Sequence, residues 1–133
     1  MDLIHELAHV VSMLKIFKKD KHLAFMGTYY WEKLAIQIEM NFLNKYFPKL
    51  FLAKLGNILQ IIHQTLFEIE IYHDPKKDPD ELYAICFNRC FKGASQKNNR
   101  SYLLNQDILY HHFRLLPYAV AYTNTLTNIL DKN

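Results

Sequence analysis

Two histidines and a glutamate near the start of this sequence have the side chains and the spacing of a metal-binding site. They stand in the stretch HELAH, so that His5, Glu6 and His9 form the pattern His-Glu-x-x-His. In an α-helix, side chains four residues apart lie on the same face, and two imidazoles placed there can bind one metal ion. A carboxylate beside such an ion can act as a general base. The pattern therefore predicts a candidate zinc site with His5 and His9 as ligands and Glu6 as the base.

The same five residues resemble the metal-binding motif of the zincin metallopeptidases. The resemblance implies a zinc-dependent hydrolase, but it covers only these five residues. The context of the motif also differs, since zincins place a strand-rich segment before the motif helix and only four residues precede His5 here. An ordinary pair of surface histidines would show the same spacing. Zinc also needs a third protein ligand. The candidates for that ligand are Glu32, Glu39, His63, Glu70, His73 and His111.

The hydrophobic pattern predicts an all-α fold that would position these residues. Apolar side chains recur every three or four residues along most of the chain, and only three of the 133 residues are glycine. A chain of this length can bury its own core as one domain. We expect a single-domain bundle of about five helices, the last one kinked at Pro117 because its apolar seam continues in phase across that residue. The expected helices span residues 2–19, 23–47, 48–73, 79–92 and 101–131.

The first of these helices carries a narrow apolar seam with alternating spacings of four and three residues. This spacing is typical of a helix face that packs against a neighbouring helix. The seam comprises Leu3, Leu7, Val10, Leu14 and Phe17. We expect it to face the core, so that His5 and His9 point away from the seam.

The helix expected at residues 23–47 has apolar side chains on two flanks, so it lies either at the centre of the bundle or with one flank free for a partner. In the helix expected at residues 48–73, Phe67 and Ile71 likewise lie among polar neighbours. Exposed apolar side chains that cluster usually mark a contact surface. The surface predicted in this way comprises Tyr29, Ile36, Met40, Leu43, Phe67 and Ile71. The favoured function is therefore a small interaction or regulatory protein that acts on a partner protein or as a homodimer, without catalysis and without a cofactor.

Glu32 and Glu39 lie seven residues apart, between the two apolar flanks. Carboxylates are seldom fully buried and need basic partners when they are. Two outcomes stay open: both side chains reach solvent, or histidines and lysines of the chain neutralise them inside. Together with the many Tyr and Phe residues, this pair also suggests a third and weaker interpretation, a helical bundle that binds a small ligand.

Composition argues against several other classes of function. The net charge is only +3 and three residues are arginine, so there is no strong signature of nucleic-acid binding. No stretch is apolar enough to span a membrane, and the N-terminus lacks the basic start and apolar core of a signal peptide. Cys86 and Cys90 are the only cysteines, which favours reduced thiols. We expect a soluble, intracellular protein, although one exported without a cleaved signal would share these features.

Overall fold

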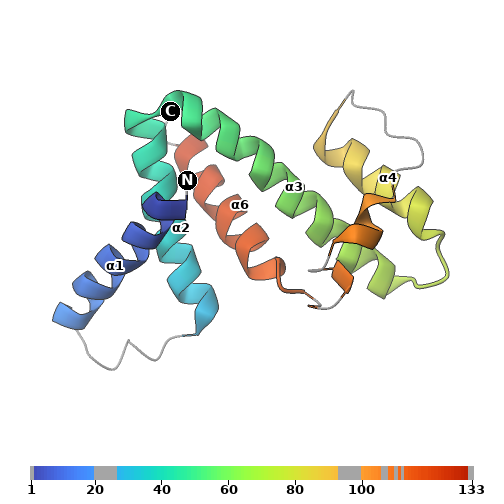
Figure 1. Cartoon of the computed structure of the whole chain (residues 1–133), viewed down its shortest axis with the longest axis horizontal. Helices are drawn as coiled ribbons and strands as arrows, with labels where there is room; N and C mark the ends of the chain where they lie inside the picture. The colour runs from blue at the N-terminus through green and yellow to red at the C-terminus, as the bar shows by residue number, and fades with distance from the viewer. Residues whose placement is uncertain are drawn as a thin grey trace. The chain divides into compact units, whose positions relative to one another are not determined.

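The structure is a computed structural model that describes residues 2–19, 27–92, 100–105, 108–109, 111 and 113–131. These residues form helices joined by turns, with no strand among them, which confirms the expected all-α fold. The α-helices labelled in Figure 1 are α1 (Asp2–Lys19), α2 (Thr28–Tyr46), α3 (Pro48–His73), α4 (Pro79–Cys90) and α6 (Leu116–Leu130). A short 3-10 helix, η2 (Ser101–Leu104), lies between α4 and α6 in the sequence. None of the helices in the described part of the chain is long and apolar enough to cross a membrane.

Two helix starts follow local signals in the sequence. Pro48 starts α3, because the first turn of a helix needs no backbone N–H from that residue. Asp78 caps α4 by accepting a hydrogen bond from the backbone N–H of Asp80 at 2.9 Å, and Pro79 takes the first helical position. The second helix was expected from residue 23. Its described part begins at Thr28, and residues 23–26 lie outside the described residues.

The expected single helix over residues 101–131 is wrong. The described residues of this stretch form η2, a short helical piece at 108–109, a turn in which Phe113 has φ 57°, and then α6. Pro117 therefore lies in the first turn of α6, where its missing N–H costs no hydrogen bond, and does not kink a longer helix. The backbone N–H of Phe113 instead donates to Glu68 Oε1 at 2.6 Å, which holds the turn in place.

The chain divides into two compact units, which we describe separately. The first comprises residues Met1–Lys54 and Val120–Asn133, and the second comprises Leu55–Ala119. In the first unit, α1 packs against α2 (Figure 1). In the second, α3, α4 and η2 share an aromatic core built from Phe67, Tyr83 and Tyr102, together with Leu82 and Cys86.

The expected orientation of α1 is also wrong. Leu3, Leu7, Val10 and Leu14 are 72%, 54%, 51% and 59% exposed, so the predicted seam faces outward where its side chains are described. The opposite face is buried instead, and it contains Ala8, Ser12 and Ile16. Small residues allow close approach of two helices, and the Ser12 hydroxyl is satisfied within α1 because it donates to the Ala8 carbonyl at 2.7 Å.

The predicted interaction surface needs a similar correction. Ile36, Met40 and Leu43 are fully buried and Phe67 is 2% exposed, so these four residues belong to the interior of their units. Both apolar flanks of α2 therefore contribute to the core, although Phe42 and Phe47 at its C-terminal end are exposed. Ile71 is half-buried against the core of the second unit, and only Tyr29 of the predicted surface remains exposed.

Candidate metal-binding site

The two histidines of the HELAH motif meet Glu32 of α2 in the first unit. His5 Nε2 lies 3.2 Å from Glu32 Oε2, and His9 Nε2 lies 3.1 Å from His5 Nε2. The third side of the triangle, from His9 Nε2 to Glu32 Oε2, measures 3.6 Å. Three atoms of the kinds that bind transition metals are thus held close together by the packing of α1 on α2.

The spacing of these three atoms suits a zinc ion. Zinc binds imidazole nitrogen and carboxylate oxygen at about 2.0–2.2 Å with tetrahedral geometry, which places two ligand atoms about 3.3 Å apart. The measured separations of 3.1, 3.2 and 3.6 Å lie on either side of that value. The side chains of His5, His9 and Glu32 are 16%, 19% and 13% exposed, so an ion could reach them from solvent.

Of the six candidates for a third ligand, Glu32 is the one that joins the two histidines in the described part of the chain. His63 is buried in the second unit, where Glu70 pairs with Lys77 and Arg89. His73 and His111 are exposed. Glu39 does lie beside His5, but on the other nitrogen of the ring.

Glu39 orients the His5 ring for this role. Its carboxylate is fully buried, and its Oε2 lies 3.1 Å from His5 Nδ1. An ionised carboxylate only accepts hydrogen bonds, so Nδ1 carries the proton and donates it to Glu39. In the neutral ring, Nε2 then keeps its lone pair on the side of Glu32 and His9. Metal-binding histidines commonly have such a carboxylate behind them.

Lys54 and Tyr122 complete the surroundings of Glu39. The ammonium of Lys54 lies 2.8 Å from Glu39 Oε1 and 5.7 Å from the centre of the Tyr122 ring. Burial opposes the charge on Glu39, but its hydrogen bonds to His5 and Lys54 and their charges outweigh burial, so the pKa of Glu39 is lowered. Burial likewise opposes the charge on Lys54, and the interactions with Glu39 and Tyr122 outweigh it, so the pKa of Lys54 is raised. Glu39 and Lys54 therefore form a charged pair inside the unit.

The same two glutamates also favour a proton on His5. The hydrogen bond with Glu39 is the main cause that raises the pKa of His5, against burial and with help from the charges of Glu39 and Glu32. A proton on Nε2 would donate to Glu32, whereas a metal ion would take the lone pair of the same atom. Proton and ion therefore compete for His5 Nε2.

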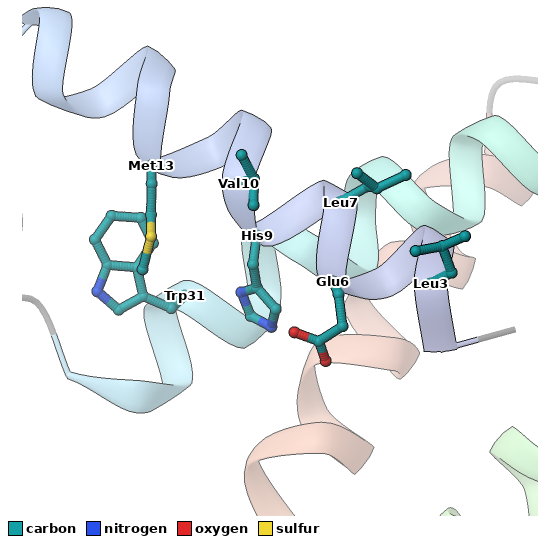
Figure 2. A pocket seen from close by; sticks show the side chains of 7 residues that line it. All are labelled: Leu3, Glu6, Leu7, His9, Val10, Met13 and Trp31. Carbon is teal, nitrogen blue, oxygen red and sulfur yellow. The ribbon is translucent and has the colours of Figure 1, made fainter.

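Glu6, the expected general base, is exposed on α1 and is not one of the three clustered groups. It lines a groove of about 560 Å³ together with His9 and Trp31. Figure 2 shows Glu6 and His9 projecting from the same side of α1, with Trp31 beside Met13 at the other end of the groove. The rest of the lining is apolar and consists of Leu3, Leu7 and Val10.

The aromatic groove that could bind a small ligand does not contain Glu32 and Glu39, the acids expected there. A groove of about 380 Å³ lies in the second unit and is lined by Phe67, Tyr72 and Tyr102, with Glu68 as its carboxylate. Glu32 and Glu39 belong instead to the site between α1 and α2. Aromatic side chains thus line a groove, but the predicted pair of acids is not part of it.

Sequence reasoning identified His5, His9, Glu32 and Glu39, but it missed Lys54 and Tyr122. Neither residue stands in a motif, and both come from helices that are remote from HELAH in the sequence. Comparisons of the chain with protein-family models, with curated proteins and with solved structures found no match. We therefore infer the function from the geometry of the site alone.

Proposed function

We propose that this protein binds a divalent ion of the zinc class through His5, His9 and Glu32. The observation that carries the proposal is the triangle of His5 Nε2, His9 Nε2 and Glu32 Oε2, with sides of 3.1, 3.2 and 3.6 Å. The buried Glu39 behind His5 Nδ1 supports it, because this carboxylate fixes the tautomer that a metal needs.

The donor set favours zinc over the common hard cations. Two imidazole nitrogens and one carboxylate oxygen suit zinc and its transition-metal neighbours, whereas calcium and magnesium prefer six or more oxygen atoms. Three protein ligands leave a fourth tetrahedral position for water, as in catalytic zinc sites. The ion would also tie α1 to α2, since the histidines and the glutamate come from different helices.

The hydrolase implied by the HELAH motif is the catalytic form of this proposal. A zinc ion held by His5, His9 and Glu32 would supply the chemistry of such a hydrolase by lowering the pKa of water toward neutrality. Glu6 would be the base, because it shares the groove wall with His9. The variant Glu6→Gln should keep the affinity for zinc and lose any hydrolysis. A fall in zinc affinity would show instead that Glu6 is a ligand.

Metal titration tests the proposal directly. Untagged protein purified without a chelator should bind one zinc ion per chain, and cobalt(II) in its place should give the intense visible absorption of a tetrahedral site. The variants His5→Ala, His9→Ala and Glu32→Ala should each lower the affinity by about 100-fold or more, since each removes one of only three ligands.

His73→Ala is the matched control, because His73 is exposed and lies outside the cluster. It should bind zinc as the wild type does. The proposal is overturned if the wild type, correctly folded by circular dichroism, binds zinc no more tightly than the three ligand variants.

A second candidate function is the interaction protein without catalysis that the sequence favours. It now rests on α1, whose apolar face is exposed, and not on the residues of α2 that the core buries. We keep an intracellular location as part of this candidate, since Cys86 and Cys90 are both free thiols.

A further inference from the structure

The outward face of α1 is an apolar stripe with the spacing of a helix-pairing seam. Leu3, Leu7, Val10 and Leu14 recur at intervals of four, three and four residues, and each exposes at least half of its surface. Such spacing is what one helix needs to pack along another. We infer that α1 of one copy packs antiparallel against α1 of a second copy of this chain.

The seam is complementary to itself when two copies run in opposite directions. Leu3 then faces Leu14 of the second copy, and Leu7 faces Val10 of the second copy. By symmetry the same two contacts occur again, so the pair has four apolar layers without an unmatched position. A self-complementary patch of this kind is what a two-fold dimer requires.

Charge selects the antiparallel direction over the parallel one. Glu6 lies in the N-terminal half of α1, whereas the exposed Lys15 and Lys18 lie near its C-terminal end. A parallel pair would bring the lysines of both copies together. An antiparallel pair places them near the end that carries Glu6, and it also opposes the two helix dipoles favourably.

The stripe is wide enough for a specific contact. Val11 and Met13 are 39% and 42% exposed and flank the seam on its two sides. Met13 also lines the groove next to Trp31, which gives the side chains of a second copy a recess to enter (Figure 2). Burying these six side chains on both copies would remove about 1,000 Å² from solvent, which is close to the lower limit for a specific interface.

This contact uses other side chains than the proposed ion, although Leu3, Leu7 and Val10 line the same groove as Glu6 and His9. His5 and His9 lie on the face of α1 that meets Glu32 and Glu39, whereas the seam lies on the outward face. Dimerisation and metal binding can therefore succeed or fail separately in experiment.

The first test is the mass of the protein in solution, measured by size-exclusion chromatography with light scattering. The wild type at about 100 μM should run as a dimer, and the double variant Leu7→Lys/Val10→Lys should run as a monomer with unchanged circular dichroism. Leu52→Lys is the matched control, because Leu52 is 66% exposed on α3, outside the seam, and should leave the dimer intact. A monomeric wild type, or a double variant that stays dimeric, overturns the inference.

Disulfide trapping then tests the direction. In a background with Cys86→Ala and Cys90→Ala, a mixture of the Leu3→Cys and Leu14→Cys proteins should form a mixed disulfide on oxidation. Each variant alone should not, because in the antiparallel pair two copies of the same position lie about 16 Å apart along the helix at 1.5 Å per residue. Efficient disulfides within the Leu3→Cys protein alone would indicate a parallel pair and overturn the proposed arrangement.

Discussion

His5 is the residue on which the geometry of the first unit converges. Its Nδ1 faces the buried Glu39 and its Nε2 faces Glu32 and His9, all within 3.2 Å. A neutral ring can donate from only one of these nitrogens. Because Glu39 holds the proton on Nδ1, the lone pair of Nε2 is directed to the two groups that would share an ion with it.

The first prediction concerns Glu39. The variant Glu39→Gln should keep an oxygen that accepts the hydrogen bond from His5 but lose the negative charge that raises the basicity of the ring. We expect the zinc affinity to fall by about 10- to 100-fold, as for other carboxylates behind metal-binding histidines. A competition titration with a coloured chelator measures this change. Glu81→Gln, on the surface of α4, is the control that should change nothing; equal affinities in both variants would contradict the assigned role.

His63 in the second unit is a buried histidine of a different kind. It is fully buried among the rings of Tyr83, Phe87 and Phe91, and its Nε2 lies 3.4 Å from the Tyr83 carbonyl. Burial lowers the pKa of His63 below its usual 6.5. We read it as a neutral core residue and not as a metal ligand.

The second prediction follows from the sign of that shift. The unfolded chain takes up the proton more readily than the folded one, so the free energy of unfolding should fall as the pH drops below 6.5 and should level off below the folded pKa. This one group contributes a slope of at most about 1.4 kcal/mol per pH unit. Urea unfolding of the wild type and of His63→Phe between pH 7.5 and 4.5 gives the free energy of unfolding of each protein as a function of pH. The difference between these two curves measures the contribution of His63, and parallel curves would contradict the prediction.

Among the helices, α4 begins with the N-cap that the sequence predicts, Asp78. The third prediction is that Asp78→Ala lowers the free energy of unfolding by about 1 kcal/mol, because the backbone N–H of Asp80 loses its acceptor. Asp78→Asn should retain most of the stability, since asparagine is an equally good cap. Denaturant unfolding followed by circular dichroism measures both variants. If the two lost the same amount, the cap would not be the cause.

α1 shows where a local pattern is not sufficient. Its spacing of leucines predicts a helix that packs through that seam, and the helix itself is confirmed. The structure instead buries the face with Ala8 and Ser12 against α2. Polar contacts explain the difference, because this orientation brings His5 and His9 to Glu32 and gives Glu39 a second partner, His5, in addition to Lys54.

At the scale of the whole molecule, the two compact units should respond differently to metal. The proposed ligands all come from the first unit, where α1 and α2 supply them. An ion that binds only the folded state stabilises it by mass action, by about 2.7 kcal/mol at a concentration 100 times its dissociation constant.

The fourth prediction is a local pattern of amide hydrogen exchange. Zinc should slow exchange in α1 and α2 and leave α4 unchanged, because α4 contributes no ligand. The double variant His5→Ala/His9→Ala should show no change anywhere. Protection that spreads equally to α4, or that persists in the double variant, would locate the ion at another site.

Local patterns in the sequence account for the first four helices but not for the division of residues 101–131. The three-and-four spacing predicts α1 to α4, and Pro48 and Asp78-Pro79 mark two starts correctly because capping depends on neighbouring backbone groups. Sequence also named His5, His9, Glu32 and Glu39 as the groups that could do chemistry. It could not rank six candidates for a third ligand, because that choice depends on which helix packs against α1.

Which face of each helix is buried depends on how the helices pack against one another. This packing placed Lys54 and Tyr122 beside Glu39, turned the leucine seam of α1 outward and used both apolar flanks of α2 in the core. It also divided the stretch at residues 101–131, where Glu68 holds the turn at Phe113 from 45 residues away in the chain. Contacts of this kind join residues that are far apart in the sequence. They form only when the helices pack, so local sequence patterns cannot predict them.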